Sequence, residues 1–429
     1  MNHIVDLHIH SHYSRATSKN SNIEGLYYWG KIKGIHVQGT GDFTHPAWFS
    51  EMREKLESDG NGLYKLKDEI ASEIDKKLPI SVRDNPMRFA LTVEISNIYS
   101  KGGKVRKLHN CIVVPDFATV SFINSRLERI GNLKADGRPI LGMDSKELLK
   151  ITLESHADSL FFPAHIWTPW FAMFGSKSGF DSIEEAFEDL APEIKAIETG
   201  LSSDPYMNWR LSELQSRTIL SNSDAHSPQK LGREANIICC DLNYKDIIGS
   251  IKTNDDRFIG TIEFFPQEGK YHYDGHRGCN IRFNPSETKK HNGLCPVCYN
   301  PLTIGVDNRI DEIANHPEGY KPAKHKQVEY IIPLIEIIAE MVKSGTSSKK
   351  VLAEYERIYT TLGDEFSILR SLPIEEIRMR GFTELAHVID RMRRGDVHIE
   401  PGYDGVYGTI KLFEDEGERT KLSDQMSLL

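Results

Sequence analysis

The feature of this sequence that most constrains its fold is a series of short apolar segments that end in histidine or acidic residues. Asp6-Leu7-His8-Ile9-His10 closes the first segment, and Asp224-Ala225-His226 follows a later one. Side chains two residues apart on a strand lie on the same face, so both imidazoles of such a pair can converge on one metal ion. Similar candidate ligands near the ends of other segments are Asp42, His45, Glu94, His109 and His165.

The order of these segments predicts an α/β fold for the first 268 residues. Apolar runs alternate with amphipathic stretches, as strands alternate with helices. We expect strands at residues 4–10, 35–42, 89–96, 109–115, 159–165, 194–199, 219–224, 236–241 and 258–264. In a β/α barrel the carboxyl ends of the strands form one face, so the candidate ligands would gather there. Many imidazoles with few carboxylates favour Zn²⁺ or Mn²⁺ over Mg²⁺ alone.

The character of the sequence changes after this α/β part. With 429 residues the chain is too long for one ordinary core. Residues 269–325 interleave Gly, His and Cys, which indicates a small zinc-binding module, and residues 326–412 have the apolar spacing of helices. Residues 413–429 are polar and charged, so we expect a flexible tail there.

Composition narrows the class of protein. Hydrophobic residues make up 39% and charged residues 27%, and the sequence shows neither a secretion signal nor a membrane span, so we expect a soluble, cytoplasmic protein. The net charge of -9 disfavours a role in coating polyanions. Within residues 270–298, however, five basic and two acidic side chains give +3, which fits contact with a phosphate backbone and a solvated charged surface equally well.

A second metal motif lies in the predicted module. His276-x2-Cys279 is followed by Cys295-x2-Cys298, two pairs with the spacing of a tetrahedral zinc site. Three thiolates and one imidazole leave no open position, so we expect one structural zinc ion. His272 and His291 are alternative nitrogen ligands.

The motifs of the α/β part together resemble those of the PHP (polymerase and histidinol phosphatase) domains. The resemblance implies a distorted (β/α)7 barrel that hydrolyses phosphoesters with two or three divalent ions (Zn, Mn or Mg). It implies one ion held by His8, His10, Glu94 and Asp224 and a second held by Glu94, His109 and His165. Phe43 stands where the family has histidine, so Asp42 or His45 would hold a third ion with His226. Glu198 remains open as a ligand, a general base or a partner that orients a histidine.

A PHP barrel followed by Gly275-His276-Arg277 with three cysteines, a helical extension and the segment 401–405 resembles the endonuclease Q family. That resemblance implies nicking of double-stranded DNA on the 5′ side of deaminated bases (uracil, hypoxanthine, xanthine) and of abasic sites, with the lesion flipped into the barrel. Candidate substrate contacts in the loops after the strands are Tyr13, Ser14, Arg15, Trp167, Ser176, Lys177, Ser202 and Ser203. The aromatic members of this set equally fit simple packing at the barrel rim.

Two other functions fit parts of the pattern. A small-molecule phosphoesterase such as histidinol phosphatase would use the same metals and barrel, but it leaves residues 270–429 without a role. A DNA-binding module with an inert metal site would lack one or more ligands, whereas the set here is complete.

The last five residues carry a further motif. Gln425-Met426-Ser427-Leu428-Leu429 is similar to the peptide by which bacterial proteins bind the sliding clamp, although Met426 and Leu429 depart from the preferred residues. With Gln425, Leu428 and Leu429 as contacts, a sliding clamp would be a partner. Five residues also match by chance.

Overall fold

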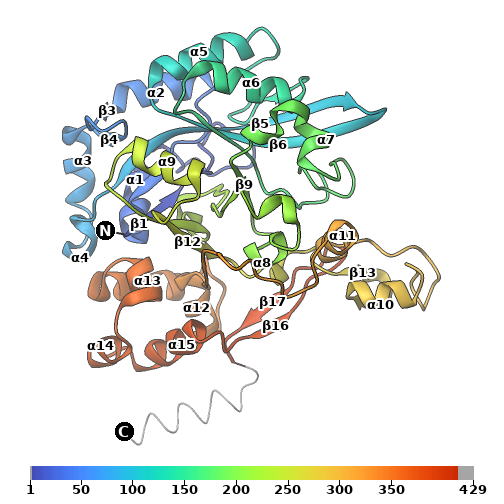
Figure 1. The fold of residues 1–429 in the computed structure, drawn as a ribbon. Coiled ribbons are helices and arrows are strands. Elements are labelled where there is room, and N and C mark those ends of the chain that lie inside the picture. The colour runs from blue at the N-terminus through green and yellow to red at the C-terminus, as the bar shows by residue number, and fades with distance from the viewer. Residues whose placement is uncertain (1, 414–429) are drawn as a thin grey trace, which may run out of the picture.

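The computed structural model describes residues 2–413 and has a mixed α/β fold built on one large sheet (Figure 1). Every strand expected from the sequence is present. The sheet contains β1 (Asn2–Asp6), β2 (Val37–Gly39), β3 (Leu56–Ser58), β4 (Tyr64–Leu66), β5 (Arg88–Lys101), β6 (Lys104–Val114), β7 (Ile140–Leu141), β8 (Leu160–Pro163), β11 (Ala235–Cys239), β12 (Phe258–Glu263) and β15 (Gln327–Tyr330).

Two further strands, β9 (Ala196–Glu198) and β10 (Thr218–Leu220), pair only with each other. A seven-stranded barrel therefore stays a prediction. The direction of the main strands is what positions the site: β1, β2 and β5 are parallel neighbours. Because β6 is antiparallel to both β5 and β8, β8 runs in the same direction as β5. The carboxyl ends of β1, β2 and β8 therefore lie toward one edge.

Helices cover the sheet and begin where the sequence supplies a capping side chain. Asn22, Asp116, Asp144 and Asn243 each accept a hydrogen bond from a backbone N–H in the first turn of the helix that follows. The helices of this part are α1 (Ile23–Lys33), α2 (Pro46–Lys55), α3 (Asp68–Asp75), α4 (Ile80–Arg83), α5 (Phe117–Leu127), α6 (Ser145–Ser155), α7 (Ile183–Phe187), α8 (Pro205–Asn208) and α9 (Tyr244–Thr253).

The C-terminal part is helical and is joined to α1, one of the helices that cover the sheet, by a buried ion pair. Lys33, at the end of α1, lies 2.7 Å from a carboxylate oxygen of Glu365, and both side chains are almost fully buried. Glu365 also accepts hydrogen bonds from the N–H of Leu334 and the hydroxyl of Tyr355, which compensates its burial. The helices are α12 (Leu334–Met341), α13 (Lys349–Leu362), α14 (Ile374–Met379) and α15 (Thr383–Arg393), with a π-helical turn at Ser367–Ser371.

The part of the chain predicted to bind zinc carries β13 (Asp274–His276), β14 (Ile281–Phe283), α10 (Pro285–Lys290) and α11 (Val306–Ile313), and is called the module below. A hairpin of β16 (His398–Glu400) and β17 (Thr409–Lys411) lies between the module and α12–α15 (Figure 1). The loop of this hairpin is fixed to the module because the N–H of Arg277 donates to the carboxylate of Asp404. The residues that follow the helices in sequence thus return to the module.

The boundaries of the parts differ in two places from those expected. Residues 327–330, assigned from sequence to the helical part, form β15 and pair in parallel with β12 in the main sheet. Phe413, expected to begin a flexible tail, is buried, because its N–H donates to Glu340 and its ring faces the guanidinium of Arg391. The clamp-type peptide, with Gln425, Leu428 and Leu429, lies outside the described residues.

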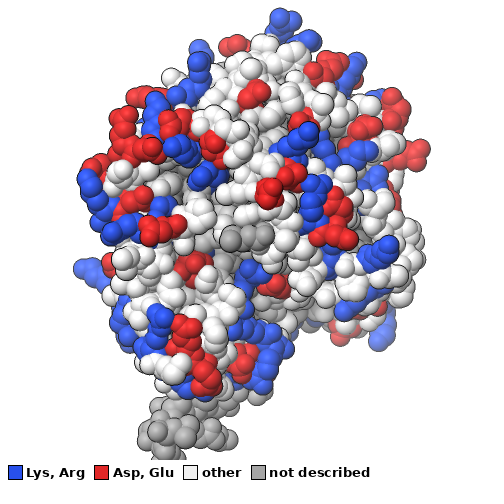
Figure 2. Space-filling view, turned by 60° about the vertical axis from the view of Figure 1, so that its left-hand side comes forward, with Lys and Arg blue, Asp and Glu red and all other residues white. Residues whose placement is uncertain are grey.

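Two surface properties bear on function. Within residues 2–413, no helix is both long and apolar enough to cross a bilayer. Figure 2 shows basic and acidic side chains mixed over the face in view, without a broad field of one sign. Any attraction of this face for a polyanion must therefore be local.

An acidic pair is buried between β11 and β12. Ala235 pairs with Ile262, which places Glu234 opposite Glu263, and neither side chain is exposed to solvent. Burial raises the pKa of Glu263 to about 8, while the hydroxyls of Thr261, Ser221 and Thr199 oppose that rise. The folded protein therefore keeps a proton on Glu263 at neutral pH, which the unfolded chain releases.

We predict that replacing Glu263 by Gln removes one source of pH-dependent instability. Between about pH 4.5 and pH 8 only the unfolded state loses this proton, so rising pH lowers the free energy of unfolding of the wild type. The amide cannot ionise, so the stability of the variant relative to wild type should rise from pH 5 to pH 8 in chemical denaturation. The control is Glu128→Gln on the exposed end of α5. A constant difference between Glu263→Gln and wild type over this range would contradict the prediction.

Candidate active site

Four side chains from three parts of the sequence converge at the carboxyl end of β1. Nε2 of His10 lies 3.2 Å from Oε2 of Glu94 and 3.1 Å from Oδ1 of Asp224. Nε2 of His8 lies 3.4 Å from Oε2 of Glu94 and 3.6 Å from Oδ1 of Asp224. These four atoms are close enough to bind one ion. The structure therefore brings together the four residues of the first predicted metal site.

The inward atoms of this group lack hydrogen-bond partners. Nε2 of His8, Nε2 of His10 and Oδ1 of Asp224 are all buried and make no hydrogen bond. The outer nitrogens are occupied, because Nδ1 of His8 contacts Glu198 at 2.9 Å and Nδ1 of His10 contacts Asp42 at 3.1 Å. Buried polar atoms are normally paired, so three unpaired atoms that face one point fit a bound cation.

A second group shares Glu94 with the first. Oε1 of Glu94 lies 2.7 Å from Nδ1 of His109 and 3.0 Å from Nε2 of His165. The two ring nitrogens are 3.2 Å apart. Because Oε1 faces this group and Oε2 faces the first, the carboxylate of Glu94 has the position of a bridge between two ions. Nitrogen and carboxylate donors in both groups suit a divalent metal such as Zn²⁺ or Mn²⁺.

The carboxylates also set the protonation of the histidines. Burial by itself lowers the pKa of His10, but the nearby carboxylates of Asp224, Asp42 and Glu94 raise that pKa well above its ordinary value. For His109 burial dominates and lowers the pKa to about 4. A metal must therefore displace a proton from His10, whereas His109 is already neutral.

Three residues of the site have a left-handed backbone. The φ angles are +52° at Asp42, +30° at His165 and +46° at Asp224. Such conformations cost on the order of 1–3 kcal/mol for a residue with a side chain and gather at functional sites. At His165 the N–H donates to Oε2 of Glu198 over 2.9 Å, so the same carboxylate holds this backbone and the ring of His8.

Glu198 does not face either group of converging atoms. Both of its oxygens accept hydrogen bonds, from His8, from the N–H of His165 and from the side-chain amide of Asn222. Of the three roles considered from sequence, this geometry fits the partner that orients a histidine.

The residues expected to hold a third ion do not converge with each other. Asp42 binds the N–H and hydroxyl of Ser11 through Oδ2, and it orients His10. His45 stacks on Tyr13 with ring centroids 4.3 Å apart. His226 directs Nδ1 to the carbonyl oxygen of Asp224. Asp42 thus supports a ligand histidine, because both of its oxygens are already engaged.

Arg138 belongs to the site, although the sequence pattern did not single it out. Its Nη1 lies 3.0 Å from Oε2 of Glu94. Burial disfavours the charge on Glu94, but His109 and Arg138 hold the pKa of this carboxyl well below its usual range. Arg138 follows Asp136-Gly137 in a polar loop without the strand-end pattern that marked the histidines.

A cavity of about 600 Å³ is lined by loop residues that also contact the metal groups. The hydroxyl of Thr168 lies 3.4 Å from Nδ1 of His165, and Arg233 donates to the carbonyl oxygen of Asp224. Its wall includes Thr168, Pro169 and Trp170 after β8, Leu201 and Ser202 after β9, and Lys230 and Arg233 in the loop after β10. The indole of Trp170 is 45% exposed, so it is available to a ligand. The loops after β8 and β9 are among those that the sequence predicted to meet substrate. The loop after β10 was not predicted, and the predicted loop at residues 11–15 does not line this cavity.

Most of the individual substrate residues predicted in those loops lie elsewhere. Ser202 lines the cavity, whereas Ser203 is buried and donates to the carbonyl oxygen of Thr199. Trp167 is also buried, with its N–H bound to Asn208, and Ser14 is occupied by Asp42. The sequence therefore identified the loop but not its exposed tryptophan. Tyr13, Arg15, Ser176 and Lys177 are partly or fully exposed and do not line this cavity.

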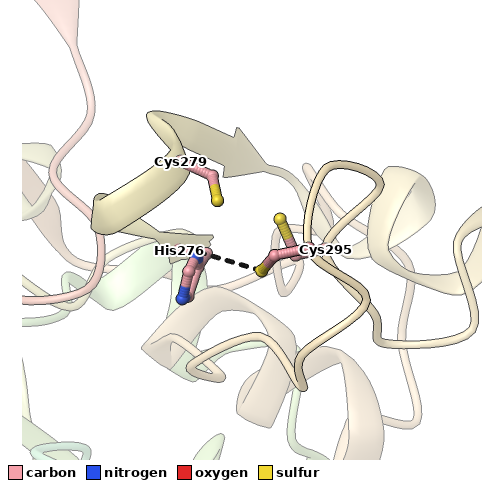
Figure 3. Close-up of side chains that lie close together, drawn as sticks. His276, Cys279 and Cys295 are labelled. Carbon is pink, nitrogen blue, oxygen red and sulfur yellow. Dashed lines mark hydrogen bonds between the residues drawn. The ribbon is translucent and has the colours of Figure 1, made fainter.

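The zinc motif forms a compact group in the module. Ligand atoms of His276, Cys279, Cys295 and Cys298 all lie within 4.8 Å of one another. Figure 3 shows His276, Cys279 and Cys295 pointing toward a common centre. The alternative ligands are outside this group, since His272 is buried in the wall of the cavity and His291 stacks on Phe283. The donor set fits a structural zinc ion.

Comparisons with known proteins show which proteins this chain resembles. A family model described as the MJ0043 C-terminal domain matches residues 333–396. The uncharacterized protein MJ0043 of Methanocaldococcus jannaschii is 34% identical over 256 residues, which are 57% of this chain and 31% of that protein. The chain thus matches less than a third of the length of that relative.

Two solved structures match along nearly the whole chain. The lesion-specific endonuclease PfuEndoQ from Pyrococcus furiosus is 29% identical, with a TM-score of 0.82 and 96% of each chain covered. An endonuclease Q in complex with a 27-mer duplex substrate, with an abasic lesion at the active site, is 30% identical, with a TM-score of 0.81 and 96% and 97% of the chains covered. The fold and the site define a metal-dependent nuclease. More particularly, the chain belongs to the endonuclease Q family.

We predict that Glu94→Gln abolishes metal binding at both metal groups, because it removes the negative charge and the oxygen that they share. Mass spectrometry of metals should find metal at these two groups near zero, with the zinc of the module retained. The comparison is Glu198→Gln, which alters the hydrogen bonds to the outer nitrogen of His8, the N–H of His165 and the amide of Asn222 but no converging atom, and should weaken binding by about 10–100-fold. Full metal content in Glu94→Gln would refute the bridging role.

For the module, we expect Cys298→Ser to release one zinc ion per chain and to lower Tm, because structural zinc contributes directly to folding. A colorimetric chelator measures the released zinc. Cys240→Ser serves as the comparison, since the thiol of Cys240 only donates to the carbonyl oxygen of Asp241. Equal zinc in both variants would show that Cys298 is not a ligand.

Proposed function

We propose that this protein is a lesion-specific DNA repair endonuclease that hydrolyses the phosphodiester on the 5′ side of a deaminated base or abasic site in double-stranded DNA. The observation that carries the proposal is the match over 96% of the chain to an endonuclease Q bound to a duplex with an abasic lesion. The two metal groups and the adjoining cavity are consistent with it.

Residues of this chain supply the binding and the orientation. His8, His10, Glu94 and Asp224 would hold one divalent ion, and Glu94 with His109 and His165 a second. When bound, such ions supply Lewis acidity that activates water and stabilises charge developing on the phosphate. Zn²⁺ and Mn²⁺ suit these donors best, and a PHP-type barrel is the scaffold that we propose for them.

Arg138 is positioned to help with the phosphate. Its guanidinium contacts Oε2 of Glu94, and the side chain is still 28% exposed, so remaining N–H groups can face a ligand. A fixed guanidinium binds phosphate oxygens in a bidentate manner, which would orient the ester without another ion. Glu198 and Asp42 would keep the rings of His8 and His10 aligned during turnover.

The cavity beside the metal groups is where we place the flipped nucleotide. Its volume of about 600 Å³ lies in the range typical of ligand pockets. The exposed face of Trp170 can stack on a base, and the hydroxyl of Ser202 can meet a polar edge. Uracil, hypoxanthine and xanthine differ from normal bases mainly in such polar edges. A sliding clamp as partner stays a prediction from sequence.

The test is a nicking assay on a labelled duplex that carries one uracil, hypoxanthine or abasic site, with Mn²⁺, Mg²⁺ or Zn²⁺. We expect one cut on the 5′ side of the lesion and none in the undamaged duplex. Trp170→Ala should raise KM about tenfold through lost stacking, whereas Tyr299→Ala, an exposed aromatic outside the cavity, should not. Intact lesion duplex together with turnover of histidinol phosphate would overturn the proposal.

A further inference from the structure

Arg233 contacts the backbone of Asp224, a proposed metal ligand, and also lines two cavities. It lies in the loop between β10 and β11, nine residues after Asp224. Its Nε donates to the carbonyl oxygen of Ser223 over 2.7 Å, and its Nη2 donates to the carbonyl oxygen of Asp224 over 3.3 Å. The guanidinium thus holds two consecutive carbonyls on the segment that carries the carboxylate of the first metal group.

This contact falls where the backbone is least stable by itself. Asp224 has a φ of +46°, which a residue with a side chain adopts only when its surroundings impose it. Its carbonyl oxygen also accepts a contact from Nδ1 of His226. The fork of Arg233 therefore helps to fix the strained turn, and with it the direction of the Asp224 carboxylate.

The exposed part of Arg233 lines two adjoining cavities. One is the cavity of about 600 Å³ beside the metal groups. The other, of about 320 Å³, also contains Lys230, Thr346 and Ser347, and the two share Lys230, Arg233, Phe264 and Glu336. A ligand that extends out of the first cavity therefore passes Arg233 to enter the second.

The second cavity has the chemistry of an anion site. Neither Lys230 nor Arg233 forms an ion pair with a carboxylate among residues 2–413. The hydroxyls of Thr346 and Ser347, before α13, add polar groups on the opposite wall. Glu336 is the acidic residue in this wall; burial raises its pKa, while the charges of Arg233, Lys33 and Lys230 oppose that rise.

We propose that this second cavity binds a backbone phosphate of the DNA strand next to the lesion nucleotide, and that Arg233 is a positioning residue that couples this phosphate to Asp224. The inference rests on the proposed function, since it assigns a subsite to the same substrate. The role of Lys230 is limited to attracting the phosphate with its positive charge. Arg233 has two roles: its Nε and Nη2 hold the two carbonyls, and its remaining N–H groups are available to the phosphate in the second cavity.

The test separates the two roles with Arg233→Lys and Lys230→Ala. Lysine keeps the positive charge but cannot hold two carbonyls in one plane, so Arg233→Lys should weaken Mn²⁺ binding about tenfold and lower kcat, with little change in KM. Lys230→Ala should leave Mn²⁺ binding unchanged, raise KM, and reduce by about one the slope of log affinity for lesion duplex against log salt. Mn²⁺ binding is measured by calorimetry on protein that retains its module zinc, without DNA.

A matched control arginine is available in α15. Arg393 also holds two consecutive carbonyls, those of Ile368 and Leu369, but far from the metal groups in the fold. Arg393→Lys should therefore lower Tm without changing Mn²⁺ affinity.

Each role has its own contrary result. Wild-type Mn²⁺ affinity in Arg233→Lys would overturn the positioning role, and a wild-type salt slope in Lys230→Ala would overturn the phosphate subsite. Failure of the proposed function shows separately, as a wild-type protein that binds Mn²⁺ but does not nick lesion duplex.

Discussion

The site depends on one buried carboxylate. Glu94 lies within the long β5–β6 hairpin, shielded from solvent, and its two oxygens face two different sets of imidazoles. A buried charge is unfavourable unless it is compensated, and here the compensation comes from histidines on several strands and from Arg138. The position of this single side chain therefore dictates how β1, β6 and β8 must present their histidines. The pKa values of His8, His10 and His165 are raised beside these carboxylates, so their imidazoles can supply part of the balancing charge, and bound ions would replace it.

Much of the site was predictable because its chemistry follows strand periodicity. The His-x-His spacing and the positions at strand ends identified all residues of the two converging groups. Sequence spacing does not show which residue faces the ion and which stands behind it. Asp42 was predicted as a ligand but orients His10, because its distance to that ring depends on how β1 and β2 pair. Arg138 and Arg233 act from loops, where no periodicity marks a functional position.

The fold was predictable for the same reason, but the prediction failed where the structure depends on contacts between segments far apart in the sequence. The expected strands are present because their apolar runs are short, rich in β-branched and aromatic residues, and bounded by turn residues. The assignment of residues 327–330 to the helical part was wrong, because pairing with β12 across some seventy positions of sequence decided their structure. The burial of Phe413 likewise depends on Glu340, which lies in a different element. Composition describes how a segment tends to behave, but a partner elsewhere in the chain can override it.

The left-handed backbone at Asp42, His165 and Asp224 has a consequence for how this sequence can evolve. Aspartate and histidine are among the few residues with a side chain that adopt this conformation readily, and β-branched residues do so very poorly. They are also the residues that bind metals and orient their ligands. Two independent filters, backbone geometry and metal chemistry, thus select the same few residue types at these positions. Glycine would satisfy the backbone geometry but would lose the metal-binding or orienting side chain. Few substitutions at these three positions can therefore be neutral.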